Sequence, residues 1–119
     1  MSTGKALSWL VALAGLWEVV APFVLGYTTG IAMYNAIIVG IVLIILGVWA
    51  ALSSNSGADR TLNWVSAVVG LWLILSPFVL GFSITSVTAM TDAIIVGIIV
   101  IILGVWAAIQ FRTQTPHPV

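Results

Sequence analysis

Residues 32–51 read AMYNAIIVGIVLIILGVWAA and residues 89–108 read AMTDAIIVGIIVIILGVWAA, so 16 of 20 positions are identical. A second match lies upstream of each: residues 9–26 and 64–81 share 10 of 18 positions, and both end in Pro-Phe-Val-Leu-Gly. The offset between copies changes from 55 to 57 residues, which places a two-residue insertion between Gly81 and Ala89. Because loops absorb such insertions, each copy is predicted to hold two elements joined by a loop.

Four apolar runs within these copies are long enough to cross a membrane. At roughly 1.5 Å per residue, about 20 helical residues cross a hydrocarbon core of about 30 Å. The runs lack two-residue alternation, which favours helices over the strands of a membrane barrel. We therefore expect an all-α integral membrane protein whose four transmembrane helices form two parallel two-helix repeats. The predicted spans cover residues 6–26, 33–52, 62–81 and 90–111.

The domain organisation follows from the repeat. We expect a single membrane domain over residues 1–119, without a separate soluble domain. Its C-terminal tail contains Pro116 and Pro118 and is predicted to be flexible. The expected parts are repeat 1 over residues 6–52, a cytoplasmic linker over 53–61, repeat 2 over 62–111 and the tail over 112–119.

The composition agrees with a chain surrounded by lipid. Hydrophobic residues make up 62% of the sequence and charged residues 5%, whereas soluble domains carry about 25% charged residues. With no Cys and a single His, the chain offers no disulfide framework, thiol nucleophile, zinc cluster or bis-His haem site. Three basic residues do not form the basic face that nucleic-acid binding needs. We expect the lipid bilayer as a partner, and no cofactor, metal or nucleic acid.

The basic residues predict the orientation. With four spans, Lys5, Arg60 and Arg112 all fall on one side of the membrane, and the two hairpin loops contain no Lys or Arg. The positive-inside rule then predicts that both termini are cytoplasmic. We expect the protein to be integral to the cell (inner) membrane.

The repeated prolines and glycines predict how the helices are shaped and packed. Pro22 and Pro77 lie inside the first span of each copy, where we expect a kink rather than a helix end, with a moving gate as the alternative. Gly26 and Gly81 suit left-handed C-terminal caps. Small residues at regular helical spacing allow close helix contacts within the chain or with another chain. The expected packing glycines are Gly15, Gly40, Gly47, Gly70, Gly97 and Gly104.

Asn35 and Asp92 occupy matching positions on the outer side, just before the unbroken apolar run of the second helix in each copy. Two interpretations stay open. An N-cap explains both residues, since either side chain accepts a bond from the free amides of the first helical turn. A cation or substrate site at the outer mouth would also use them.

The tryptophans differ in predicted depth. Trp17 and Trp72 lie near the middle of their spans and are expected to pack between helices, because a deep indole N–H needs a partner. Four others lie toward the cytoplasmic ends and are expected to form an interfacial belt: Trp9, Trp49, Trp64 and Trp106.

Glu18 departs from both the repeat and the apolar pattern. Its counterpart in the second copy is Leu73, and a charged carboxylate this deep costs about 2.5 kcal/mol or more. We therefore expect a protonated, hydrogen-bonded side chain, with Ser76 or the indoles of Trp17 and Trp72 as partners. The bond would join helices or subunits, or else Glu18 would act as a proton relay or substrate contact. Against a relay, Asp92 is expected at a different depth, which leaves Glu18 isolated.

The two-helix unit resembles the SPW repeat family of small bacterial and archaeal membrane proteins. In the second copy, Trp72 is followed by Ser76-Pro77-Phe78-Val79-Leu80-Gly81 and then by Asp92-Ala-Ile-Ile-Val-Gly97. The first copy has Ala21-Pro22-Phe23-Val24-Leu25-Gly26 and Asn35-Ala-Ile-Ile-Val-Gly40. Both copies have Phe where the family name has Trp. The resemblance implies a four-helix membrane domain and supplies no catalytic residue or substrate.

These observations predict a non-enzymatic module that acts in a structural or accessory role through helix association. The expected assembly is a homo-oligomer or a larger membrane complex. The alternative is a small transporter or proton-linked channel that uses Glu18, with Asp92 at the outer mouth.

Overall fold

The computed structural model describes residues 3–26, 30–54, 56–81 and 87–113, and the regular secondary structure in these ranges is helical. Each of the four helices has the length and the hydropathy of a membrane span. The expected all-helical fold with four membrane-length helices is therefore confirmed. The helices are α1 (Thr3–Leu25), α2 (Gly30–Leu52), α3 (Ser56–Val79) and α4 (Val87–Thr113).

All four helices begin before the apolar runs that predicted them. The difference is largest at α3, which begins at Ser56, so most of the expected linker over residues 53–61 is helical. Hydropathy falls at Asp59, but an acidic side chain in the first turn stabilises the N-terminus of a helix. The expected tail also begins too early, because α4 continues to Thr113. Residues 114–119, where flexibility was expected, lie outside the described residues.

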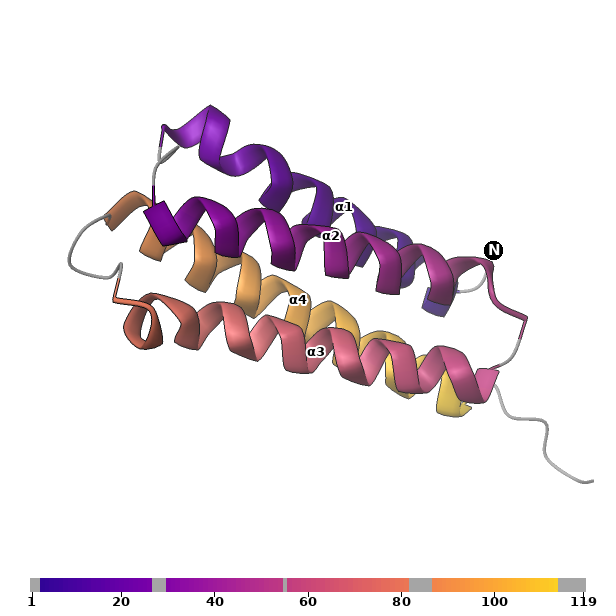
Figure 1. Cartoon of the computed structure of the whole chain (residues 1–119). Helices are drawn as coiled ribbons and strands as arrows, with labels where there is room; N and C mark the ends of the chain where they lie inside the picture. Colours follow the sequence, from indigo (N-terminus) through magenta and orange to yellow (C-terminus); the bar gives the residue numbers. More distant parts are fainter. Residues whose placement is uncertain (1–2, 27–29, 55, 82–86, 114–119) are drawn as a thin grey trace, which may run out of the picture.

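The helices form an antiparallel bundle in which each helix packs beside the next. α1 packs against α2 and α4, and α3 packs against the same two helices. The contacts are most extensive within the pairs α1–α2 and α3–α4. Figure 1 shows that α1 and α3 run in the same direction. We call the end where α1 and α3 finish the hairpin end, and the opposite end, where α1 and α3 begin, the terminal end.

Glycines bring the backbones together within each of these pairs. A Cβ atom added to Gly40 would lie 2.6 Å from the carbonyl oxygen of Gly15, and one added to Gly97 would lie 2.6 Å from that of Gly70. At Gly47 and Gly104 the nearest atoms are likewise backbone atoms of the partner helix. A side chain has no room at such contacts.

Pro22 and Pro77 lie within α1 and α3, and both helices continue past them. Each proline lacks the N–H that would bond the carbonyl four residues earlier. In α3 the Ser76 hydroxyl donates to the freed carbonyl of Leu73 at 2.8 Å. Gly26 and Gly81 follow the two helices with φ of 87° and 84°, so the expected left-handed conformation is confirmed.

Apolar and polar residues alternate along the bundle interior. An alanine cluster at the hairpin end includes Ala21, Ala36 and Ala93. Nearer the middle lies an apolar cluster of six buried residues. Buried polar side chains occur between these clusters and again at the terminal end. The six residues of the central cluster are Val11, Val39, Leu43, Leu73, Val96 and Val100.

The close glycine contacts predict a specific cost of substitution. Gly40→Ala should lower the free energy of unfolding by about 1–3 kcal/mol, the usual range for overpacking. The added Cβ would meet backbone atoms of Gly15 and Val19, which cannot rotate away. Denaturant unfolding in detergent micelles measures the change. Ile41→Ala, at a neighbouring position that is 47% exposed, is the control. An equal loss in both variants would contradict the account.

Candidate functional site

Glu18 points into the bundle interior and contacts a second acid. Its side chain is 1% exposed, and its carboxyl group shares a hydrogen bond with that of Asp92 on α4. The other oxygen, Glu18 Oε1, is buried without a hydrogen-bond partner among the described residues. Because two ionised carboxylates cannot hydrogen bond, the pair holds at least one proton in this geometry.

The expectation that Glu18 is isolated, at a different depth from Asp92, is therefore wrong. Glu18 lies seven residues before the end of α1, and Asp92 lies five residues after the start of α4. At about 1.5 Å per residue these positions are roughly 10 Å and roughly 8 Å from the hairpin end. The expected depth of Asp92 was too shallow because α4 begins at Val87, three residues before the predicted span.

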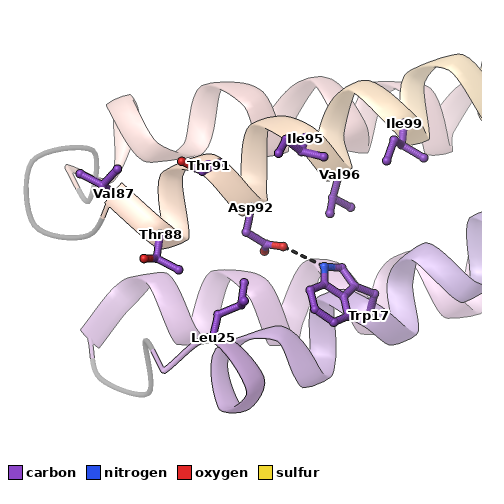
Figure 2. A pocket seen from close by; sticks show the side chains of 9 residues that line it. All are labelled: Trp17, Leu25, Val87, Thr88, Thr91, Asp92, Ile95, Val96 and Ile99. Carbon is purple, nitrogen blue, oxygen red and sulfur yellow. Dashed lines mark hydrogen bonds between the residues drawn. The ribbon is translucent and has the colours of Figure 1, made fainter.

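The neighbouring tryptophan completes this contact between α1 and α4. Trp17 Nε1 donates to Asp92 Oδ1 at 2.8 Å, and Figure 2 shows the indole and the carboxyl group facing each other. The deep indole thus has the partner that its depth required. Glu18 is not bonded to this indole, which was one of its expected partners.

The equivalent residues of the other repeat make an equivalent contact between α2 and α3. Trp72 Nε1 donates to Asn35 Oδ1 at 3.0 Å, and Asn35 Nδ2 donates to Ser76 Oγ at 3.1 Å. Trp72 and Asn35 are the repeat counterparts of Trp17 and Asp92. Each of these Trp side chains therefore bonds a residue of the opposite repeat.

The interpretation of Asn35 and Asp92 as N-caps is wrong. α2 begins at Gly30 and α4 at Val87, so each residue is the sixth of its helix. Their side chains make hydrogen bonds across the bundle. The cap pattern failed because residues of low hydropathy at the start of each helix were assigned to the loops.

A cavity of about 490 Å³ lies beside the acid pair, between α1 and α4. Asp92 and Trp17 line it, and Thr88 and Thr91 line it nearer the hairpin end. The remaining wall is apolar (Figure 2) and consists of Leu25, Val87, Ile95, Val96 and Ile99. The site thus combines a carboxyl pair with an indole, two hydroxyls and apolar walls.

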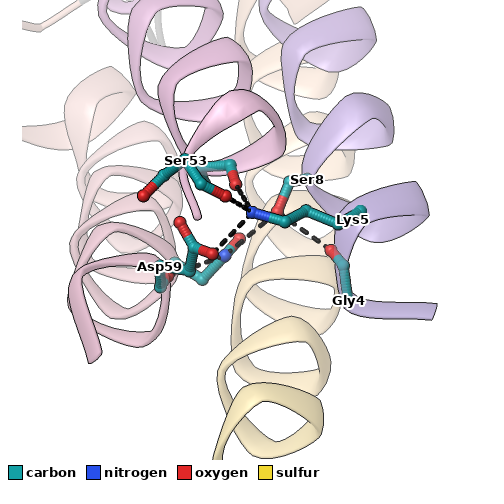
Figure 3. A network of polar contacts seen from close by, with 7 residues as sticks. Gly4, Lys5, Ser8, Ser53 and Asp59 are labelled. Carbon is teal, nitrogen blue, oxygen red and sulfur yellow. Dashed lines mark hydrogen bonds and ion pairs between the residues drawn. The ribbon is translucent and has the colours of Figure 1, made fainter. Parts of the chain in front are cut away.

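A second polar network lies at the terminal end (Figure 3). Lys5 Nζ forms an ion pair with Asp59 Oδ2 at 2.6 Å and donates to the Ala50 carbonyl at 2.6 Å. It also donates to the carbonyl of Ser53. Lys5 on α1 therefore neutralises a buried acid of α3 and bonds the carbonyls at the end of α2, where a cation is favourable. Sequence reasoning used Lys5 for orientation and missed this network.

Ser8 and Asn63 meet in the same network. Asn63 Nδ2 donates to Ser8 Oγ at 3.1 Å and to the Asp59 carbonyl at 2.9 Å. Ser8 and Asn63 are 55 residues apart, which is the offset between repeats, so equivalent positions meet at the bundle centre. The sequence contained one signal for this contact, because both repeats have a polar residue at this position. Asp59 Oδ1 and Asn63 Oδ1 are buried without a partner among the described residues.

The remaining tryptophans and the basic residues of the sequence analysis lie toward the terminal end of the bundle. The four tryptophans expected in a belt lie in the terminal half of their helices with 36% to 58% of their surface exposed: Trp9, Trp49, Trp64 and Trp106. Lys5, Arg60 and Arg112 lie on helix segments at the terminal end. Which side of the membrane this end faces stays a prediction. Within the described part of the chain, no three His, Cys, Asp or Glu side chains are grouped as metal ligands.

The architecture defines a class of protein, an all-helical membrane protein with four apolar helices. A family model described as the SPW repeat domain matches residues 5–107, and the chain belongs to this family. The resemblance found in the sequence is thereby confirmed. Comparisons with curated proteins and with solved structures give no match.

The Trp17–Asp92 contact predicts a measurable coupling between α1 and α4. A double-mutant cycle with Trp17→Phe and Asp92→Ala should give a coupling energy of about 0.6 kcal/mol and at most about 1.7 kcal/mol, the range for hydrogen bonds between membrane helices. Unfolding of each variant in micelles measures it. The cycle with Trp72→Phe and Asn35→Ala is the matched comparison across α2 and α3. Additive effects in both cycles would contradict the two contacts.

Proposed function

We propose that the protein is a non-enzymatic membrane module that acts in a structural or accessory role by associating with other membrane helices. The observation that carries this proposal is where the polar side chains lie. Lys5 with Asp59, Trp17 with Asp92 and Trp72 with Asn35 all join helices of the same chain. These polar interactions stabilise the bundle from inside. The outward faces can therefore associate with other helices through apolar contacts.

The outward faces support association as well as contact with lipid. A hollow of about 290 Å³ between α1 and α2 is lined by apolar side chains that include Trp9, Leu16 and Ile44. Helices in membranes associate chiefly by close packing of such surfaces, since hydrocarbon gives no hydrophobic driving force. An outer helix with a matching ridge would fill the hollow. Glu18, by contrast, contacts Asp92 inside the chain, which argues against its use as a bond between subunits.

The mass and composition of the native particle test the proposal. Extracted in a nanodisc from its own membrane, the protein should appear in a multiple of 12.6 kDa or with a second protein in stoichiometric amount. Multiples alone indicate self-association, and a second protein indicates an accessory subunit. Dilution with excess lipid is the control. A true complex should keep its mass, whereas two unassociated chains that share a nanodisc by chance should separate. A single 12.6 kDa chain at every dilution would contradict the proposal.

The second candidate is proton-linked transport, and the observation that favours it is the Glu18–Asp92 pair. Two acids in contact can hold and release a proton, and intramembrane acids are often functional. The central apolar cluster opposes this function. Its members include Val11, Leu43 and Val100, which are fully buried and lie between the pair and the polar residues of the terminal end.

Proton flux in liposomes tests this second candidate. Glu18→Gln should lower the flux through the reconstituted protein, because the amide cannot carry the proton. Ser76→Ala is the matched control. It removes a polar side chain from the same region and introduces alanine, which the first repeat has at the matching position, Ala21. Equal flux in Glu18→Gln and the unchanged protein would exclude Glu18 as the carrier.

A further inference from the structure

The two sides of the bundle carry different polar side chains at several positions where the repeats diverge. On the α1–α4 side the chain has Glu18, Asp92, Thr88 and Thr91. The matching positions on the α2–α3 side are Leu73, Asn35, Ile31 and Tyr34. Three of the four residues on the α1–α4 side line the 490 Å³ cavity, and Glu18 bonds to the one that is an acid. The two faces share a backbone arrangement, but the α1–α4 face carries both acids and smaller polar side chains.

The cavity continues along the groove between α1 and α4 toward the terminal end. A second hollow of about 380 Å³ shares Trp17, Val96 and Ile99 with the first. Its other lining residues are apolar and lie deeper, among them Leu13 and Leu103. The groove is therefore polar near the hairpin end and apolar toward the middle of the bundle. An amphiphile in that half of a bilayer is arranged in the same way, with its polar headgroup at the surface and its alkyl chain toward the middle of the membrane.

The charges at the polar end of the groove select a cation. When the carboxyl pair holds a single proton, its net charge is −1, which is costly in hydrocarbon. Among the described side chains, the basic groups lie at the terminal end, where Lys5 is paired with Asp59. An ammonium group beside Asp92 would make the pair electrically neutral. The indole of Trp17 lines the same space, and aromatic faces attract ammonium groups.

We propose that the α1–α4 groove binds a long-chain primary amine. The ammonium group would donate to the Asp92 carboxyl and to the hydroxyls of Thr88 and Thr91, and Glu18 would hold the shared proton behind Asp92. The alkyl chain would follow the apolar groove past Trp17. The amine comes either from the headgroup of an aminolipid or from a free lipophilic amine in the membrane. This site does not depend on association with other helices.

Binding of dodecylamine to the protein in phosphatidylcholine nanodiscs tests the proposal. Native mass spectrometry should find one saturable dodecylamine per chain. Dodecanol, which has the same chain and no charge, should not saturate the site. Binding of both molecules with equal affinity would overturn the proposal, because the groove would then recognise only the chain. Absence of saturable dodecylamine would overturn it as well.

Two variants locate the site. Asp92→Asn, which introduces the residue that the other repeat has at this position, should weaken dodecylamine binding by about tenfold or more through loss of the charge pair. Thr91→Tyr, also the residue of the other repeat, should fill the cavity and abolish binding even if Asp92→Asn fails to fold. Tyr34→Thr, the reverse change on the α2–α3 side, should leave binding unchanged. Unchanged binding in Thr91→Tyr would overturn the proposal.

The same variants distinguish the two sources of the amine. If the source is a lipid, protein released from its native membrane should retain an aminolipid, and Thr91→Tyr should lose it. If the source is a free amine, the released protein should carry no aminolipid and should still bind added dodecylamine. Retention of phospholipids irrespective of headgroup, with no binding of dodecylamine, would overturn both forms of the proposal.

Discussion

Two hydrogen bonds between an indole and a short polar side chain join the repeats to each other. Trp17 of the first repeat bonds Asp92 of the second, and Trp72 of the second bonds Asn35 of the first. Hydrocarbon offers these groups no alternative partner, so each bond constrains which helices lie side by side and at what depth. The α1–α4 and α2–α3 contacts are less extensive than those within the helical pairs. Directional bonds between the repeats, these two among them, therefore help to specify how the two halves meet.

Much of the fold could be predicted because the same pattern of apolar residues, glycines and prolines occurs in both repeats. Identical spacing of Gly40 and Gly97, and of Gly15 and Gly70, indicated close helix contacts, and the structure places these glycines where a Cβ atom would meet partner backbone. The four spans followed from hydropathy alone. Their ends did not, because helices continue through residues such as Asp59 whose charge is neutralised by a neighbour in space.

The candidate site could be predicted only in part, since it depends on which helices are neighbours. Glu18 was evident as an acid inside a span, but its partner was assigned to Ser76 or an indole rather than to Asp92. A residue near the edge of an apolar run resembles a cap until the true start of the helix is known. Once α4 begins at Val87, Asp92 reaches the depth of Glu18 from the opposite direction. Chain order places these two residues far apart, and no local pattern connects them.

The departures from the repeat carry the chemical information, because the repeated residues explain the bundle. Glu18 and Asp92 lie on one side of a molecule whose other side has Leu73 and Asn35 at the matching positions. An apolar cluster separates this region from the Lys5–Asp59 network at the opposite end. The bundle is thus symmetric in its packing and asymmetric in its polar side chains.

The contact between the two acids is the central claim, and the sequence makes it directly measurable. Glu18 is the single glutamate in the chain, and only Asp59 and Asp92 are aspartates. Solid-state NMR of protein in lipid, with carbon-13 in the Glu and Asp carboxyl groups, should show a cross-peak between Glu18 and one aspartate that disappears in Asp92→Asn and persists in Asp59→Asn. A Glu18 carboxyl group that contacts no aspartate in the folded protein would contradict the account.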